Sequence, residues 1–407
     1  YSIDFSRFST PTGVGSLSNQ LKRRIRVIVV SNDNDEKIWE LFQLSNQKYI
    51  EMAAYLDVKS SNWGNYAYKG EQTELRIVSV GRALKMLEEG MADIFLLYSC
   101  YTEYDEYSFQ SLKQFGVKEE QIWFVPYEFI FGMKHIDPHT INEITPFMER
   151  HELKTIELHA AEHCNLNCKF CSMFCGLVPK PAFPDYEETR RGLEELKKYI
   201  THVKKVRIIG GEPLLNPELG KYLKLVRNIY PYTNIRLITN GILAKCMDET
   251  LIETMRKSNV ELIVTGYQPL MDKHEEIHEF LAMKGIKHSI GNLILEFQKI
   301  YDYRGTSDAV ANHNVCRWKK SCATLYGGNL APCFTPFVIH YLSEAFDLNI
   351  QESGIMDLYE RGMTSEKIHR FFEMPFDLCR YCSDKRLFAK WERIKHGEIV
   401  TIEDWSA

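Results

Sequence analysis

Short apolar runs alternate with stretches of helical periodicity over the first third of the chain. The runs are rich in Val, Ile and aromatic residues and are bounded by polar turns, which is typical of buried strands in a parallel sheet. The predicted strands are 23–32, 48–58, 74–80, 92–98 and 121–127. The helices predicted between them are 35–46, 81–90 and 106–116. This order indicates a small Rossmann-like parallel α/β domain.

A second series of strands and helices begins near residue 153, and each strand–helix unit spans about 25 residues. The predicted strands are 155–161, 204–211, 234–241, 261–267 and 286–291. The predicted helices are 185–200, 217–230, 248–259 and 274–285. Units of this length are typical of a parallel barrel or partial barrel whose site lies at the carboxyl ends of the strands.

The fold class predicted from these patterns is α/β, with an irregular cysteine-rich α+β extension after the second series. Five segments follow from it: a flexible lead-in, a Rossmann-like domain, a connector, a partial barrel and the cysteine-rich extension. Their boundaries are 1–23, 24–128, 129–152, 153–300 and 301–407.

The first domain lacks the usual signal of a dinucleotide site. Its first strand is followed by the loop SNDNDEK, which contains no glycine, whereas such sites place glycines there for the phosphates. Asp57 ends the second strand, where a ribose-binding acid could lie. We therefore interpret this domain as a docking or substrate-positioning module without the glycine-rich fingerprint.

Composition and charge narrow the classes of function. The 407 residues are 44% hydrophobic and 26% charged, which is ordinary for a folded protein, and the formal net charge is −5. This balance argues against nucleic acid or an anionic membrane surface as the main partner. No run of 18 apolar residues occurs, and the polar start lacks the apolar region of a signal peptide.

The eleven cysteines cluster at short spacings, which favours metal ligation in a reducing cytoplasm over a disulfide scaffold. Cys164, Cys168 and Cys171 follow the first strand of the second series within EHCNLNCKFC. Three thiolates on one loop can hold three irons of a four-iron cluster and leave the fourth iron open to a small molecule. The alternative is a structural zinc site, with Cys175 as its fourth ligand.

At these residues the sequence resembles the radical S-adenosylmethionine (radical SAM) superfamily, in which an aromatic residue, here Phe170, precedes the last cysteine. The resemblance covers 153–290 and implies a partial (β/α)6 barrel of the TIM type. It also implies cofactor contacts at the ends of the second, third and fourth strands. The corresponding residues are Gly210, Gly211, Glu212 and Pro213, then Thr239, Asn240 and Gly241, then Thr265, Gly266 and Tyr267.

The resemblance implies a reaction as well as a fold. A reduced [4Fe–4S] cluster cleaves S-adenosylmethionine, and the 5′-deoxyadenosyl radical takes a hydrogen atom from the substrate. The GGEP motif, which ends in Glu212 and Pro213, is expected to bind the amino group of the methionine part. The cofactor carries the radical chemistry, while the protein orients the reactants and excludes water. A reducing partner such as flavodoxin or ferredoxin is expected, and Phe170 is expected near the adenine.

A second group of cysteines follows the barrel, and it comprises Cys316, Cys322, Cys333, Cys379 and Cys382. One knuckle-spaced pair plus two earlier cysteines can bind zinc or a four-iron cluster. The run from Cys316 through Gly328 to Cys333 resembles the auxiliary-cluster extension called SPASM or, in its shorter form, twitch. The resemblance implies a second [4Fe–4S] cluster held by Cys316, Cys333, Cys379 and Cys382. A predicted hairpin at Gly327 and Gly328 instead favours Cys322 in place of Cys316.

Twitch and SPASM enzymes act on small molecules, chiefly sugars, or on peptides and proteins. Many peptide maturases carry a winged-helix domain at the N-terminus, whereas the first domain here reads as parallel α/β. The function predicted is therefore hydrogen abstraction from a carbohydrate-like or nucleotide-linked small molecule, as in dehydrogenation or epimerisation. The alternatives are a peptide- or protein-modifying maturase and a non-catalytic iron–sulfur electron carrier.

Overall fold

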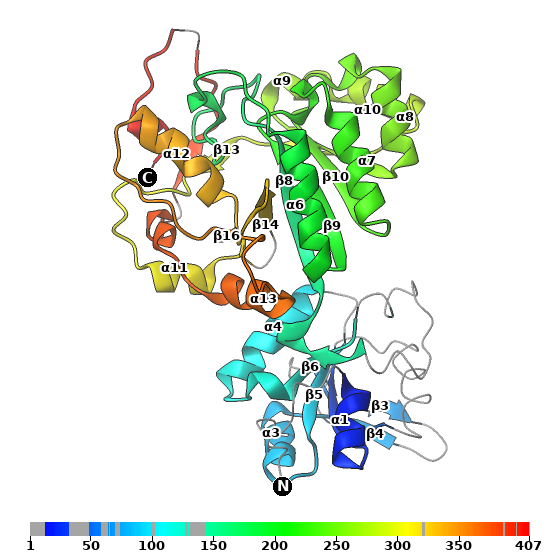
Figure 1. Cartoon of the computed structure of the whole chain (residues 1–407). Coiled ribbons are helices and arrows are strands. Elements are labelled where there is room, and N and C mark those ends of the chain that lie inside the picture. The colour runs from blue at the N-terminus through cyan, green and yellow to red at the C-terminus, as the bar shows by residue number, and fades with distance from the viewer. Residues whose placement is uncertain are drawn as a thin grey trace. The chain divides into compact units, whose positions relative to one another are not determined.

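The computed structural model divides into two compact units, Tyr1–Arg150 and His151–Ala407, and each is described by itself (Figure 1). The structure describes residues 13–31, 49–57, 64, 66–69, 74–98, 102–126, 129, 143–319, 322–385, 387–395 and 397–406. No helix within these ranges is long and apolar enough to cross a membrane.

The first unit contains a mainly parallel sheet with the strand order β3-β4-β2-β1-β5-β6-β7. The strands are β1 (Ile25–Val30), β2 (Ile50–Leu56), β3 (Tyr66–Lys69), β4 (Glu74–Val78), β5 (Ile94–Leu97), β6 (Ile122–Phe124) and β7 (Thr145–Pro146). The five strands from β4 to β6 pair in parallel, whereas β3 and β7 are antiparallel edges. The predicted parallel sheet is therefore confirmed.

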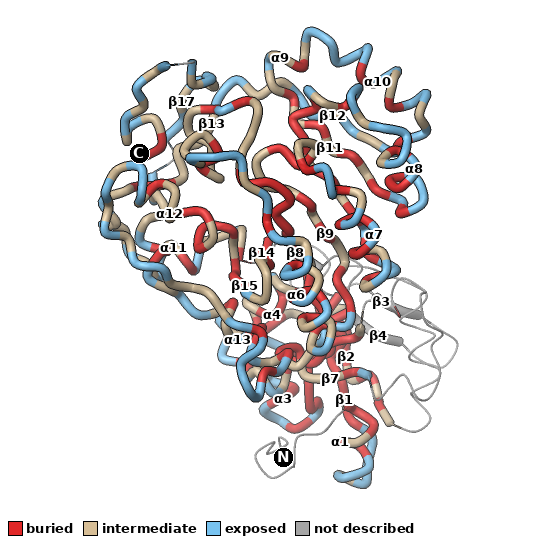
Figure 2. Tube along the Cα trace, turned by 45° about the horizontal axis from the view of Figure 1, so that its top comes forward, coloured by how far each residue is buried: buried red, intermediate tan, exposed pale blue. Residues whose placement is uncertain are grey.

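Buried apolar residues explain why β1 lies at the centre of this sheet. Five of its six residues, in IRVIVV, are buried, as a strand covered on both faces requires (Figure 2). The helices of this unit are α1 (Val14–Leu21), α3 (Val80–Glu88) and α4 (Thr102–Gln114). Residues 14–21 were expected in a flexible lead-in, but they form α1 because Val14 and Leu17 are fully buried in the core. The predicted helix 35–46 lies outside the described residues.

A buried carboxylate ties the start of β1 to the start of β5. Arg23 donates two hydrogen bonds to Asp93, at 2.7 and 2.8 Å, and the backbone and guanidinium of Arg26 donate further bonds. Burial alone would raise the pKa of Asp93, but the hydrogen bonds from Arg23 and Arg26 hold it below its ordinary value. The ionised carboxylate therefore stabilises the folded unit.

Replacing Asp93 with alanine removes the buried carboxylate to which both arginines are bonded, and should lower the free energy of unfolding by about 2–3 kcal/mol. The loss is no larger because both arginines are partly exposed and can bind water instead. The native pKa is depressed, so this stabilisation is present above the unfolded pKa. It is lost as the pH falls below about 4. Hydrogen exchange of β1 and β5 amides at several pH values measures it. Asp93→Ala should remove the acid-dependent loss, whereas the exposed control Glu89→Ala should behave as the parent.

The second unit contains a larger sheet with the order β12-β11-β10-β9-β8-β14-β15-β16. The strands are β8 (Glu152–Ala161), β9 (His202–Gly210), β10 (Asn234–Thr239), β11 (Val260–Gly266), β12 (Lys287–Leu293), β14 (Ala323–Tyr326), β15 (Asn329–Ala331) and β16 (Met356–Asp357). The first five pair in parallel in chain order, and β14 pairs in parallel with β8. The expected series of parallel strands and helices is confirmed.

Helices cover one face of this sheet (Figure 1). They are α6 (Tyr186–Tyr199), α7 (Leu219–Ile229), α8 (Glu249–Lys257) and α10 (His274–Met283). The side chains of Asp185 and Asp248 cap the starts of α6 and α8 by accepting backbone N–H bonds at 2.8 and 2.7 Å. Alternate strand residues such as Ile156 and Leu158 pack under the helices, while Glu157 and Arg207 point to the other face.

The sixth parallel strand is β14, which comes from the cysteine-rich segment rather than from 153–300. A boundary at residue 300 therefore does not divide the sheet. A two-residue turn at Gly327 and Gly328 joins β14 to β15, as the sequence predicts. Gly192 of α6 lies so close to the carbonyl of Gly327 that a Cβ atom would clash with it. The hairpin is thereby held against α6.

The remaining elements of the second unit lie outside its large sheet. They are β13 (Glu296–Gln298), β17 (Phe388–Lys390), α9 (Gln268–Met271), α11 (Ala309–Val315), α12 (Thr335–Ala345) and α13 (Ser365–Glu373). Strands β13 and β17 form an antiparallel pair although they lie some ninety residues apart in the chain. A separate apolar cluster that includes Phe174, Tyr301 and Trp405 packs α12 against the end of the cysteine loop and the C-terminal segment.

Candidate functional site

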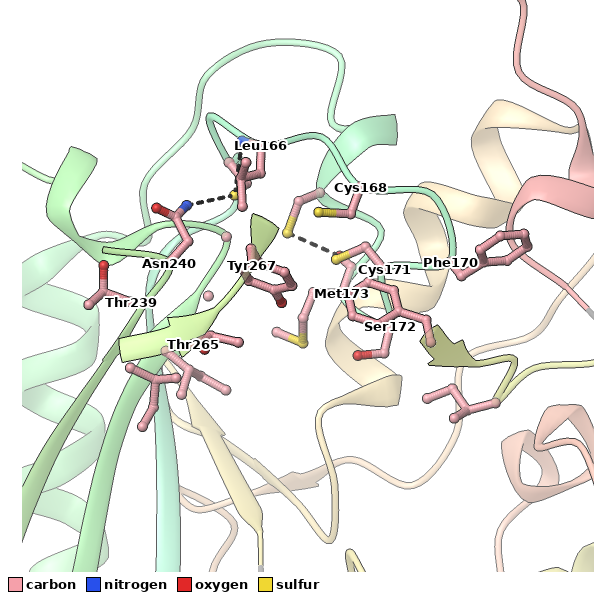
Figure 3. Close-up of a pocket in the computed structure, with 18 of the residues that line it drawn as sticks. Leu166, Cys168, Phe170, Cys171, Ser172, Met173, Thr239, Asn240, Thr265 and Tyr267 are labelled. Carbon is pink, nitrogen blue, oxygen red and sulfur yellow. Dashed lines mark hydrogen bonds between the residues drawn. The ribbon is translucent and has the colours of Figure 1, made fainter. Parts of the chain in front are cut away.

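The three cysteines of the first group lie on the loop that follows β8, at the carboxyl edge of the sheet. Cys164, Cys168 and Cys171 line a cavity of about 340 Å³, together with Cys175. Figure 3 shows the side chains of Cys168 and Cys171 opposite Asn240 and Tyr267, which come from the ends of β10 and β11. The parallel strands thus bring the loop and the strand ends to one place.

The thiols differ in how readily they ionise. Burial raises the pKa of Cys164 to about 11 and that of Cys168 to about 12. Cys171 has a pKa lowered to about 7, because its sulfur accepts a hydrogen bond from the Cys175 thiol and others from backbone N–H groups. Metal ligation requires thiolates, so metal binding at this loop would release protons from Cys164 and Cys168.

Cys175 is buried beside Cys171, and its pKa is raised by the hydrogen bond that it donates to Cys171 and by burial. It begins a 3-10 turn over Cys175–Leu177. The structure therefore brings four thiols to this cavity, as the zinc alternative requires. The Cys175→Ala substitution distinguishes a ligand role for Cys175 from a role as a hydrogen-bond donor.

The GGEP segment contributes to the cavity through its glycines. Among the described residues, the cavity wall includes Gly210 and Gly211 but neither Glu212 nor Pro213. The Gly211 N–H donates to the carbonyl of Ala161 at 2.7 Å, and a Cβ atom on Gly211 would collide with the carbonyl of His163. Only glycine allows the two chain segments to approach this closely.

Glu212 is fully buried and holds the end of β10 in place. Its carboxylate accepts hydrogen bonds from the Thr239 hydroxyl at 2.7 Å, the Asn240 N–H at 2.8 Å and the Leu214 N–H at 3.0 Å. Burial raises the pKa of Glu212, and these three bonds act against that rise. Both Thr239 and Asn240 line the cavity, so Glu212 acts on the cavity through them.

The strand ends supply the opposite wall. Thr239, Asn240, Thr265 and Tyr267 all line the cavity, whereas Gly241 and Gly266 lie behind it. The Asn240 amide donates to the side chain of Asn165 at 2.7 Å and lies 3.6 Å from the Cys164 sulfur. A polar wall therefore faces the thiols at hydrogen-bonding distance.

Phe170 has a left-handed backbone (φ 59°), and its ring lies under the ammonium group of Lys299 at 4.7 Å. Figure 3 shows the ring directed away from Asn240, on the far side of the cysteines. Phe170 lines the cavity, but its expected contact with an adenine stays a prediction.

The C-terminal segment closes over the cysteine loop, which the sequence analysis did not anticipate. The Trp391 indole N–H donates to the Cys168 sulfur at 3.2 Å, and the Trp391 ring stacks on Tyr267. Arg393 donates to the carbonyl of Leu166 at 2.9 Å, and Lys169 forms ion pairs with two acids of this segment, Glu398 and Asp404. No motif marks Trp391, because its partners lie more than a hundred residues away in the chain.

The second group of cysteines surrounds a larger cavity, of about 790 Å³. Cys316, Cys333, Cys379 and Cys382 all line it, and Cys322 does not. Burial raises the pKa of Cys333 to about 12, and it also raises the pKa of Cys379 and Cys382. The amide of Asn312 donates to the carbonyls of Cys379 and Cys382, at 3.0 and 2.8 Å. Helix α11 thus holds both knuckle cysteines in position.

Cys322 lies elsewhere, at the start of β14. Arg207 of β9 donates to its sulfur at 3.5 Å, and Arg207 also pairs with the buried carboxylate of Glu157. The structure therefore groups Cys316, rather than Cys322, with Cys333, Cys379 and Cys382.

The two cavities share part of their walls. Gln298, Ile300, Arg317 and Trp318 line both of them. Arg317 also lies over the ring of Trp318 at 5.2 Å. No motif marks these four residues in the sequence: Gln298 ends β13, Ile300 lies just after it, and Arg317 and Trp318 follow Cys316.

The donor sets fit iron–sulfur clusters in their chemistry. Across the described ranges, no three His, Cys, Asp or Glu side chains come close enough together to hold one metal ion. The thiolates of a four-iron cluster each bind a different iron and stand farther apart than the ligands of a single zinc ion. Four thiols line each cavity, so the second matches the ligand number of a closed cluster, and the first matches that of an open cluster when Cys175 is a hydrogen-bond donor and not a ligand.

Comparisons with known proteins give a consistent result. Residues 160–289 match the profile of the Radical SAM superfamily. Over 131 residues the chain is 30% identical to GTP 3′,8-cyclase of Staphylococcus carnosus, covering 30% of this chain and 37% of that enzyme. Over 125 residues it is 26% identical to 7,8-dihydro-6-hydroxymethylpterin dimethyltransferase of Methanocaldococcus jannaschii, covering 30% of this chain and 24% of that enzyme. The chain thus matches well under half the length of these curated relatives.

Among solved structures, BtrN in complex with AdoMet and 2-DOIA aligns with a TM-score of 0.37 and 18% identity, over 58% of this chain and 97% of BtrN. Streptococcus suis SuiB bound to S-adenosylmethionine aligns with a TM-score of 0.27 and 17% identity, over 34% of this chain and 32% of SuiB. The superfamily match begins one residue before the end of β8 and includes the cysteine loop, the GGEP segment and the ends of β10 and β11. Residues 160–289 therefore form a domain of the radical SAM superfamily.

Proposed function

We propose that the chain is a radical SAM enzyme that reductively cleaves S-adenosylmethionine and abstracts a hydrogen atom from a carbohydrate-like or nucleotide-linked small molecule. The observation that carries the proposal is the first cavity, where Cys164, Cys168 and Cys171 face the polar ends of β10 and β11. Such a cavity offers a three-thiolate site for the cluster and polar groups for a cofactor that binds its open iron.

In this proposal Cys164, Cys168 and Cys171 hold a [4Fe–4S] cluster, which supplies the electron for cofactor cleavage. Gly210 and Gly211 offer backbone edges to the methionine part. The absence of a side chain on Gly211 allows this segment to lie close to the carbonyl of His163. Thr239, Asn240, Thr265 and Tyr267 orient the ribose and adenine parts from the strand ends, with Phe170 at the adenine. Trp391 covers Tyr267 and limits water at the cysteines.

A second [4Fe–4S] cluster is part of the same proposal, held by Cys316, Cys333, Cys379 and Cys382. The four thiols line one cavity, and that cavity shares Gln298, Ile300, Arg317 and Trp318 with the first. A substrate bound at this shared wall would lie between the two clusters. A cytoplasmic flavodoxin or ferredoxin is the proposed electron source.

The proposed substrate class rests on two supports. The first unit contains a parallel α/β sheet instead of the winged helix found in many peptide maturases. Two curated relatives carry names that describe reactions on GTP and on a pterin, both small molecules.

In the first unit, the hydroxyl of Tyr104 donates to buried Asp57 at 3.0 Å, and most of the loop after β1 lies outside the described residues. A docking or substrate-positioning role for this unit stays a prediction.

The experiment that tests this function uses the full chain with reconstituted clusters, S-adenosylmethionine, dithionite and sugar nucleotides deuterated in the sugar. We expect 5′-deoxyadenosine that carries deuterium from one of them. Deuterium drawn only from a labelled peptide library would instead establish a maturase. The complete absence of 5′-deoxyadenosine with iron in place would refute the proposal.

Replacing Glu212 with alanine should weaken S-adenosylmethionine binding while the iron content stays that of the parent. Without the carboxylate, Thr239 and the Asn240 N–H lose the acceptor that holds them at the cavity wall. A loss of about 1.5–3 kcal/mol of binding free energy from their displacement would raise the dissociation constant about ten- to a hundredfold. Equilibrium binding measures it, with Glu218→Ala as the control, because Glu218 is half exposed and forms an ion pair with Lys221. An unchanged dissociation constant would contradict the assignment of this segment.

A further inference from the structure

A lysine is buried at the second cavity, where the four thiols meet. Lys319 lines this cavity with Cys316, Cys333, Cys379 and Cys382, and only 6% of its side chain is exposed. A buried ammonium group is costly unless charges or hydrogen bonds offset its loss of water. Its surroundings therefore indicate what the charge is for.

The partners of Lys319 hold its charge at the cavity wall. Its Nζ lies 3.1 Å from Nδ1 of His313, and His313 is itself only 1% exposed. An ammonium group has no acceptor, so Nδ1 accepts and Nε2 carries the hydrogen. Nε2 then donates to the carbonyl of Phe372 at 3.2 Å. The imidazole is thereby fixed as a neutral acceptor that orients the ammonium group without cancelling its charge.

An acid at the end of a helix stands near enough to Lys319 to reduce this charge. Glu373, the last residue of α13, has a carboxylate oxygen 3.8 Å from Nζ, beyond hydrogen-bond distance, and its side chain is 27% exposed. Water screens a partly exposed carboxylate more than a buried ammonium group. Of the other charged residues that line this cavity, Arg317 and Lys385 are positive and Asp384 is negative, so positive charges outnumber negative ones at its wall.

A four-iron cluster bound by four thiolates carries two negative charges when oxidised and three when reduced. A nearby positive charge stabilises the reduced form more than the oxidised form, and net charge is one of the factors that set the potential of such clusters. We propose that Lys319, oriented by His313, raises the reduction potential of the second cluster and so favours its role as an electron acceptor. This inference rests on the second cluster in the proposed function.

The test is a redox titration of the full reconstituted chain, followed by electron paramagnetic resonance. The signal of the second cluster is the one that disappears in a Cys379→Ala, Cys382→Ala variant. Lys319→Met keeps the length of the side chain and removes the charge, so its midpoint potential should shift to a more negative value. Lys319→Arg should stay near the parent, and Glu373→Gln should shift to a more positive value. Lys221→Met, which removes an exposed lysine, should leave the potential unchanged.

The outcomes separate the inference from the function on which it rests. If no signal depends on Cys379 and Cys382, the second cluster is absent and the proposal fails at that level. If the signal is present in every variant with the same midpoint, the cluster stands and the role of Lys319 is overturned. If Lys319→Met cannot retain iron, Glu373→Gln decides alone: a positive shift supports the inference and an unchanged midpoint overturns it.

Discussion

Single alanine substitutions at Cys164, Cys168 and Cys171 will each abolish the formation of 5′-deoxyadenosine. Each thiolate binds one iron of the cluster, and two thiolates do not hold a stable four-iron cluster. Cofactor cleavage requires that cluster in its reduced form, so each variant should lose it. The three thiols line one cavity, so the three variants should fail in the same way. Chromatography of the products after incubation with S-adenosylmethionine and dithionite measures the loss.

The matched control is Cys175→Ala, which removes a thiol from the same loop. Cofactor cleavage needs one iron without a protein ligand, and a fourth thiolate would block that iron. Cys175 is therefore not expected to be a ligand, and we expect 5′-deoxyadenosine formation to remain when it is replaced. The variant removes one of the hydrogen bonds that lower the pKa of Cys171, so its cluster should assemble less readily near pH 7 and better at higher pH. If Cys175→Ala instead eliminates the iron at this loop, the site has four ligands and the proposed chemistry is wrong.

Iron in the second site will depend on Cys316 and not on Cys322. Cys316 lines the same cavity as Cys333, Cys379 and Cys382, whereas Cys322 contacts Arg207 and Glu157. In a parent without the first-site cysteines, Cys316→Ala should lose the remaining iron and Cys322→Ala should keep it. Iron and zinc content per chain measures both variants.

The reverse pattern, with iron lost from Cys322→Ala and kept in Cys316→Ala, would show that the hairpin argument identifies the right thiolate. Zinc in place of iron in the parent would eliminate the auxiliary cluster altogether. Cys379→Ala serves as the positive control, because it lies on the knuckle that Asn312 holds.

Much of the fold follows from the sequence because the parallel strands are buried on both faces. An apolar run such as IRVIVV must be covered on both faces, so it lies in the centre of a sheet. A helix between each pair of strands then favours parallel connections. The edge strands β3 and β7 and the short strand β14 were harder to place. They are two to four residues long, and their pairing depends on partners that are distant in the chain.

The hairpin at Gly327 and Gly328 illustrates a correct local prediction that did not settle the site. Its register pairs Thr324 with Ala331, as a two-residue turn requires. Strand β15 nevertheless ends at Ala331, and the chain turns before Cys333. The register of the hairpin therefore does not bring Cys322 to the second cavity, which Cys333 lines. The position of Cys316 depends instead on α11, which packs against the knuckle cysteines.

Residues that act through partners far away in the chain were beyond sequence reasoning. Trp391 donates to a sulfur 223 positions earlier, and Lys319 is recognisable only once His313 and the four thiols surround it. The carboxylate of Glu212 accepts hydrogen bonds from Thr239 and Asn240, and its expected contact with the cofactor stays a prediction. A motif identifies a segment, but packing decides which atoms of that segment reach the cavity.

The central claim is that the first cluster has one iron open to S-adenosylmethionine. The most direct measurement is the electron paramagnetic resonance spectrum of the dithionite-reduced full chain before and after S-adenosylmethionine is added. We predict that the signal dependent on Cys164, Cys168 and Cys171 changes on addition, while the signal dependent on Cys379 and Cys382 does not. A first-site signal that is identical with and without S-adenosylmethionine would contradict the account.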